Sequence, residues 1–164
     1  MAVKILVTGG TIDDLEYASP EDAPKVHKSL IRKLLEQSRV TAKYNIEELM
    51  HKDSRHITES DRKCIAEACR KSKENAIVIT HGTLTMAPTA KYLSKEHMQK
   101  TIVLVGAAIP ANKPHSDALF NIGAAFTAAQ ILAHGVYICM NGQVFLGENV
   151  KKNLSKGIFE KETQ

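Results

Sequence analysis

Three glycine-rich segments of the chain place hydroxyl and amide side chains directly after apolar runs. They are Thr8-Gly9-Gly10-Thr11, His81-Gly82-Thr83-Leu84-Thr85, and the segment 106–112 with Ser116-Asp117 after it. Glycine lets the backbone approach a ligand closely, so that amide N–H groups and a threonine hydroxyl can reach it. Such a hydroxyl beside backbone donors suits nucleophilic attack on a carbonyl with stabilisation of the oxyanion. One glycine turn alone is more often plain geometry, but three of them indicate a ligand site.

The apolar runs before these segments indicate buried parallel strands. Continuous apolar runs occupy residues 3–7, 76–80, 101–105 and 136–140, and a shorter strand is expected at 41–46. Helical spacing or capping signals predict helices over residues 19–37, 58–69, 87–93 and 116–134. Strands that alternate with helices predict a three-layer α/β fold, with a mostly parallel, flavodoxin-like sheet covered by helices on both faces. Asn141-Gly142 predicts a hairpin that adds an antiparallel edge strand over 143–146.

Length and composition fit one intracellular domain. The chain has 164 residues, of which 43% are hydrophobic and 24% charged, and no linker divides residues 1–164. Residues 153–164 are charged with few apolar anchors and are expected to form a loosely held tail. Scattered lysines argue against nucleic-acid binding, and the longest apolar run is too short to span a membrane. Without a signal-peptide pattern, the cytoplasm is the expected location.

The glycine-rich segments resemble the signatures of the bacterial-type L-asparaginases and glutaminases, specifically of their N-terminal domain. The segment 5–12 is similar to the first family signature, and the resemblance implies that Thr11 is the nucleophile. The segment 78–86 is similar to the second, in which Thr83 belongs to a Thr-Asp-Lys group. The segment 105–121 is similar to a third block, in which backbone groups such as that of Ala107 line the pocket.

Weaker matches extend this resemblance. Asp53-Ser54 resembles the loop whose serine holds the substrate carboxylate, and the stretch 147–152 implies that Lys152 is the catalytic lysine, with Lys151 as the alternative. Tyr17 is the tyrosine available to help activate the nucleophile. Backbone groups of Gly10 and Gly82 are expected beside the substrate.

The chain departs from the family at two points. Leu84 stands where the family has aspartate, and leucine can neither ionise nor accept a hydrogen bond from a substrate ammonium group. The resemblance also implies that the family's C-terminal domain is absent. An altered amide substrate is therefore expected, one without an α-ammonium group or one that holds it through Asp13, Asp14 or Asp117.

Simpler structural roles are open for several of these residues. Thr85 and Ser116 are expected to cap helices, and His81 to orient its loop by hydrogen bonding. Arg55, next to Ser54, could also grip a substrate carboxylate. Three cysteines without paired spacings, Cys64, Cys69 and Cys139, indicate reduced thiols rather than a metal site.

Two hypotheses of different classes follow. The first is a homodimeric amidohydrolase that needs no cofactor or metal, acts on a small amide or amino-acid-like ligand, and releases ammonia through a threonine nucleophile. The second is a non-catalytic binding or regulatory domain derived from such an enzyme. A flavodoxin-like nucleotide-binding domain is a weaker third, because Gly9-Gly10 lacks a phosphate-binding fingerprint.

Overall fold

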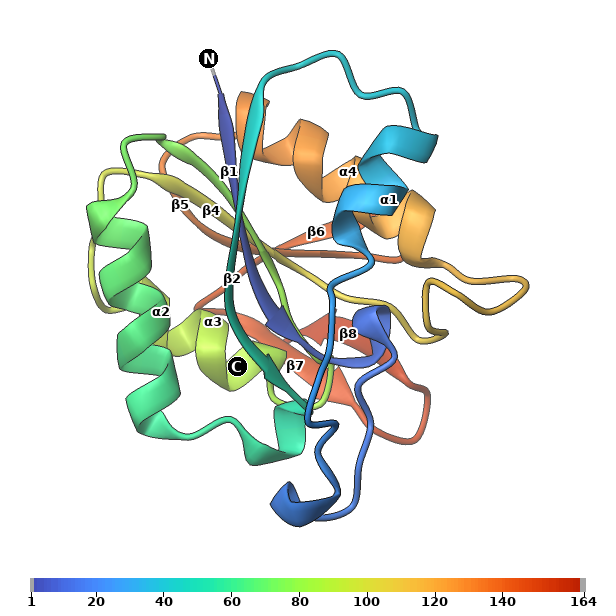
Figure 1. Ribbon diagram of the computed structural model, residues 1–164. Coiled ribbons are helices and arrows are strands. Elements are labelled where there is room, and N and C mark those ends of the chain that lie inside the picture. Colours follow the sequence, from blue (N-terminus) through green and yellow to red (C-terminus); the bar gives the residue numbers. More distant parts are fainter. Residues whose placement is uncertain (1, 163–164) are drawn as a thin grey trace.

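The computed structural model describes residues 2–162, and a six-stranded sheet forms its centre (Figure 1). The strands lie in the order β2-β1-β3-β4-β5-β6, in which the first five are parallel and β6 is antiparallel to β5. Their bounds are β1 Val3–Gly9, β2 Tyr44–Lys52, β3 Ala76–Thr80, β4 Thr101–Val105, β5 Gly135–Met140 and β6 Gln143–Leu146. The predicted mostly parallel sheet with an antiparallel edge hairpin is confirmed, and its strand order is that of flavodoxin-like folds.

Helices cover both faces of this sheet. Helices α1 and α4 lie on one side and α2 and α3 on the other, which gives the three expected layers (Figure 1). The helices are α1 Ile31–Gln37, α2 Glu59–Lys71, α3 Met86–Ser94 and α4 Ala118–Ile131. Thr58 and Asp61 form the predicted capping box at the start of α2. None of the helices in residues 2–162 has the length and apolar character that a membrane crossing requires.

The segment before α1 is less helical than the sequence pattern predicted. The Ser19-Pro20 signal opens only a 3₁₀ turn, η2 (Pro20–Asp22), and α1 begins at Ile31. Val26, which completed the helical spacing, is 90% exposed and packs against nothing in the core. A capping signal can therefore start a turn that tertiary packing does not extend into a helix.

Two element ends also differ from the prediction. Strand β2 starts at Tyr44 and continues to Lys52, because its pairing with β1 runs from Val3 to Gly9. Asp117, rather than Ser116, is the N-cap residue of α4, and its carboxylate accepts hydrogen bonds from the backbone N–H groups of Ala108 and Ile109.

The C-terminal segment is ordered as strands. Strands β7 (Val150–Asn153) and β8 (Ile158–Lys161) form a separate antiparallel pair, in which Lys152 lies opposite Phe159. The side chains of Val150 and Phe159 are buried. The expectation of a loose tail from residue 153 is thus wrong as far as 162, because two apolar anchors suffice to pin a short hairpin; residues 163–164 lie outside the described residues.

Candidate active site

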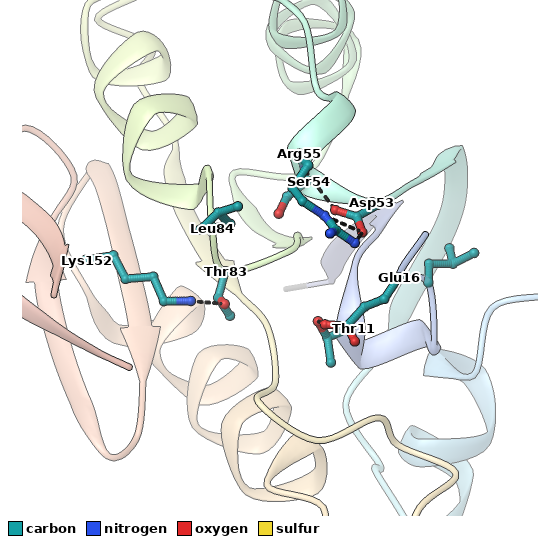
Figure 2. A pocket seen from close by; sticks show the side chains of 9 residues that line it. Thr11, Glu16, Asp53, Ser54, Arg55, Thr83, Leu84 and Lys152 are labelled. Carbon is teal, nitrogen blue, oxygen red and sulfur yellow. Dashed lines mark hydrogen bonds and ion pairs between the residues drawn. The ribbon is translucent and has the colours of Figure 1, made fainter. Parts of the chain in front are cut away.

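A cavity of about 310 Å³ opens where β1 and β3 end. These neighbouring strands flank the point at which the strand order reverses, where open α/β sheets bind ligands. Figure 2 shows two sides to the cavity. We call them the first wall (Thr11, Glu16, Asp53, Ser54 and Arg55) and the second wall (Thr83, Leu84 and Lys152); Leu15 completes the lining.

Thr11 lies on the first wall, at the start of a 3₁₀ turn that follows β1 (η1, Thr11–Asp13). Its hydroxyl donates a hydrogen bond of 2.8 Å to Glu16 Oε1. Glu16 was not among the residues predicted from the sequence, because Asp13, Asp14 and Glu16 all follow Thr11 and no sequence signal distinguishes them. The hydroxyl that could attack a substrate is therefore already bonded to a proton acceptor.

Two glycines hold the walls close together. A Cβ atom added to Gly10 would lie 2.3 Å from the backbone nitrogen of Gly82, and Gly10 has a φ of 84°, which L side chains rarely adopt. A Cβ atom on Gly82 would lie 2.5 Å from Ser54 Oγ. Both positions thus need glycine for close backbone approach. Neither lines the cavity, so these two residues act on the site through its backbone geometry.

His81 fixes the second wall from beneath, in the loop-orienting role expected from the sequence. Its Nδ1 lies 2.8 Å from the carbonyl oxygen of Gly82, which can only accept, so Nδ1 carries the proton and Nε2 accepts from the Thr89 hydroxyl. Arg62 in turn donates to the same Thr89 oxygen. Complete burial lowers the pKa of His81 to about 4, so the ring is neutral and orients the loop.

Thr83 and Lys152 meet on the second wall. The Lys152 ammonium group donates a hydrogen bond to Thr83 Oγ1, although the two residues come from different parts of the fold (Figure 2). Desolvation by burial lowers the pKa of Lys152, and the charge of Glu16 across the cavity partly opposes this shift. Lys152, not Lys151, therefore faces the cavity, and its amine is easier to deprotonate than that of a solvated lysine.

Ser54 lies at the base of the first wall, on the 3₁₀ turn η3 (Ser54–His56). Its carbonyl accepts from the Thr85 hydroxyl, so Thr85, at the N-cap position of α3, ties η3 to the second wall. Asp53 accepts from the backbone N–H and the guanidinium group of Arg55, contacts that hold the pKa of this carboxyl below its usual value despite burial. A cation and a hydroxyl thus adjoin at this end of the cavity.

Besides the two glycines, two further predicted site residues lie outside the lining. The ring of Tyr17 stacks on His56, with centroids 5.1 Å apart, and its backbone N–H donates to Asp53. Ala107 is buried and does not line the cavity.

The three acids considered for a substrate ammonium group are occupied elsewhere. Asp13 is buried and accepts from Ser29 and from the backbone of Leu30. Asp14 contacts Asn112, and Asp117 holds backbone N–H groups. The acids that share the cavity with Leu84 are Glu16 and Asp53, and Asp53 is paired with Arg55.

The site thus joins an acid-bonded hydroxyl, a second hydroxyl held by a lysine, and a cation that can attract a carboxylate. These groups suffice for nucleophilic attack on a carbonyl with proton transfer by side chains. Within residues 2–162, no cluster of three or more His, Cys, Asp or Glu side chains is placed to bind a metal ion.

Comparisons with known proteins find relatives that match nearly the whole chain. The chain is 30% identical over 162 residues to the L-asparaginase of Thermococcus kodakarensis, covering 96% of this chain and 49% of that protein. The structure of the thermostable L-asparaginase from that organism superposes with a TM-score of 0.85 at 32% identity, over 98% of this chain and 51% of that one. The chain therefore spans about half the length of these relatives.

Two further proteins extend the comparison. A probable cytoplasmic L-asparaginase from Campylobacter jejuni gives a TM-score of 0.75 at 27% identity, over 98% of this chain and 51% of that one. A glutamyl-tRNA(Gln) amidotransferase component from Methanococcus vannielii is 41% identical over 97 residues, which are 57% of this chain and 22% of that protein. Residues 2–159 match the family model described as asparaginase, N-terminal, and the chain belongs to this family.

Proposed function

We propose that this chain is an amidohydrolase that cleaves a small carboxamide through Thr11 and releases ammonia. The observation that carries the proposal is the Thr11 hydroxyl, which donates to Glu16 inside a cavity that also holds the Thr83–Lys152 pair. Membership of the asparaginase N-terminal family supports the same reaction class.

The reaction proceeds in two steps. The Thr11 oxygen attacks the carboxamide carbon, and the carbon–nitrogen bond breaks to release ammonia and leave an acyl-threonine ester. Water then attacks the ester, releasing the carboxylic acid and restoring the hydroxyl. The lowered pKa of Lys152 suits it to exchange a proton through Thr83 during these steps.

Leu84 determines the substrate class in this proposal. It lines the cavity on the second wall and is 42% exposed, so it presents an apolar surface where a carboxylate would hold an ammonium group. Arg55 and Ser54 on the first wall suit a substrate carboxylate. The preferred substrate is therefore an ω-amide that carries a carboxylate but no α-ammonium group next to Leu84.

The alternative is a binding domain without turnover, and Leu84 is the residue that favours it. A domain of this kind would retain the cavity and bind an amide without cleaving it. The Thr11 hydroxyl would then be a binding contact only.

The test is ammonia release from L-Asn, D-Asn, L-Gln and the des-amino amides succinamate and glutaramate. Thr11→Ala serves as the inactive variant, and Thr127→Ala, which removes an exposed hydroxyl on α4, serves as the matched control. We expect release by the wild type and the control, highest with the des-amino amides, and none by Thr11→Ala. Binding of an amide by folded protein without release would favour the alternative.

Oligomeric state and location are part of the same proposal. We expect a homodimer, the commonest symmetric assembly, which light scattering after size-exclusion chromatography would detect. The similarity to a probable cytoplasmic L-asparaginase supports the cytoplasm, which cell fractionation would test.

A further inference from the structure

We propose that Glu16 is the catalytic base that accepts the proton of Thr11. This inference rests on the proposed function and assigns a role to a residue that neither the motifs nor the family signatures identify. It starts from the direct hydrogen bond between the Thr11 hydroxyl and Glu16 Oε1.

The backbone on both sides of Glu16 is tied down. The N–H group of Leu15 donates to the carbonyl of Gly10, and that of Tyr17 donates to Asp53 Oδ2. The side chain of Leu15 is buried. These contacts hold the peptide groups next to Glu16 in the turn that follows Thr11, so the carboxylate is positioned before any substrate arrives.

The charges around Glu16 suit an anion that faces the cavity. Its negative charge adds to the larger effect of Asp53 in raising the pKa of Arg55, and it partly opposes the desolvation that lowers the pKa of Lys152. Two cations therefore flank the carboxylate from η3 and from β7. In the described residues, Asp53 is the other acid that lines the cavity, and it is already bonded to Arg55.

The competing bases are engaged elsewhere. The ring of Tyr17 is stacked on His56, and the amine of Lys152 is bonded to Thr83 on the opposite wall. His81 is buried beneath the loop with both ring nitrogens in hydrogen bonds. The geometry thus favours the carboxylate that Thr11 already contacts.

The protons that enter and leave the Thr11 hydroxyl are balanced through Glu16. As the Thr11 oxygen bonds to the carbonyl carbon, its proton moves to Glu16 Oε1, and Glu16 then gives this proton to the departing nitrogen to form ammonia. In the second step Glu16 takes a proton from water, whose oxygen bonds to the acyl carbon. The bond between that carbon and the Thr11 oxygen breaks, and the proton returns to Thr11.

The test compares Glu16→Gln with wild type by two measurements. Glu21→Gln, a nearby exposed acid outside the cavity, is the matched control, and unfolding midpoints verify that each variant is folded. For amide hydrolysis we expect kcat of Glu16→Gln to fall about 10²- to 10⁴-fold with KM changed less than about threefold.

The second measurement needs no turnover. A fluorophosphonate probe phosphonylates activated hydroxyls with loss of fluoride, and mass spectrometry gives the rate at which Thr11 is modified. We expect modification of wild type and Glu21→Gln, and a rate about 10²-fold lower in Glu16→Gln.

The outcomes separate this inference from the proposed function. If wild type hydrolyses no amide but its Thr11 is modified in a Glu16-dependent manner, the amidohydrolase proposal fails and the role of Glu16 stands. Equal modification of wild type and Glu16→Gln, or an unreactive wild-type Thr11, overturns the role of Glu16. It is overturned as well if Tyr17→Phe reduces modification as much as Glu16→Gln does.

Discussion

Each wall of the cavity carries a threonine, and the two threonine hydroxyls have opposite roles in their hydrogen bonds. On the first wall the Thr11 hydroxyl donates a hydrogen bond to a carboxylate, whereas on the second wall the Thr83 hydroxyl accepts a hydrogen bond from the amine of Lys152. Its hydrogen bond to Glu16 thus makes the Thr11 oxygen more nucleophilic. One lone pair of the Thr83 oxygen, in contrast, already accepts the hydrogen bond from Lys152. In the proposed mechanism, the hydrogen-bond partner of each threonine distinguishes the nucleophile from the proton relay.

The walls also differ in how locally they are built. Glu16 is five residues from Thr11, so one turn brings them together, but Lys152 reaches Thr83 across 69 residues. The Thr11–Glu16 contact is therefore a property of one loop, whereas the Thr83–Lys152 contact depends on the docking of β7. Substitutions can test each side of this contrast.

The largest expected effect comes from removing the amine of the second wall. Lys152→Met keeps most of the side-chain length but leaves Thr83 without its donor, and we expect kcat/KM for the best amide to fall about 10³-fold. Lys151→Met is the matched comparison, because Lys151 is exposed and pairs with Glu160. A greater loss in Lys151→Met would show that the neighbouring lysine is the catalytic one.

The next effect tests the point where the walls meet. Gly10→Ala places a Cβ atom against the backbone of Gly82 and imposes a positive φ on alanine, so we expect the free energy of unfolding to fall by about 3–4 kcal/mol. Gly157→Ala has a similar φ of 70° but open space around it, and should cost about 1 kcal/mol. Urea denaturation measures both, and equal costs would contradict the close approach of the walls.

The buried histidine beneath the second wall gives that wall a pH-dependent stability. The unfolded state binds a proton at His81 near pH 6.5, but the folded state does so only near pH 4. As the pH falls from 6.5 to 4, this one group should lower the free energy of unfolding by about 3 kcal/mol. Urea denaturation at several pH values should show that His81→Gln lacks this pH-dependent loss in the free energy of unfolding. An NMR titration midpoint of His81 near 6.5 in the folded protein would refute the prediction.

The smallest expected effect concerns substrate choice. Leu84→Asp restores a carboxylate beside Lys152, and we expect it to raise the ratio of kcat/KM for L-Asn to that for succinamate about tenfold. Leu84→Asn supplies a similar shape without the charge and should change the ratio less. If both variants change it equally, polarity rather than charge at residue 84 sets the preference.

Sequence patterns predicted the buried strands better than the loops. Ala76–Thr80 and Thr101–Val105 were located to the residue, because fully buried parallel strands are continuous apolar runs. The 19–37 helix was overpredicted, since Val26 fits a helical spacing without a surface to pack on. The tail was misjudged because the burial of Phe159 depends on β7, which no local pattern reveals.

The same contrast holds for the site. The positions of Thr11 and Thr83 after adjacent strands follow from glycine turns and sheet topology, which can be predicted from the sequence. The hydrogen-bond partner of Thr11 could not be predicted from the sequence. Glu16 lies in a polar loop with other acids, and only the three-dimensional turn after Thr11 brings Glu16 to its hydroxyl. Tyr17 was selected for its residue type, but its backbone turns it towards His56.

The separate β7–β8 pair has a consequence for the order of assembly. Because Lys152 is presented by a hairpin outside the main sheet, its contact with Thr83 closes a loop of 69 residues, and contacts of this separation form late and slowly in folding. The Thr11–Glu16 turn can form early, but the complete constellation exists only once the hairpin has docked. A partly folded chain would thus display Thr11 without Lys152, and under the proposed function it would react with amides only when folding is complete.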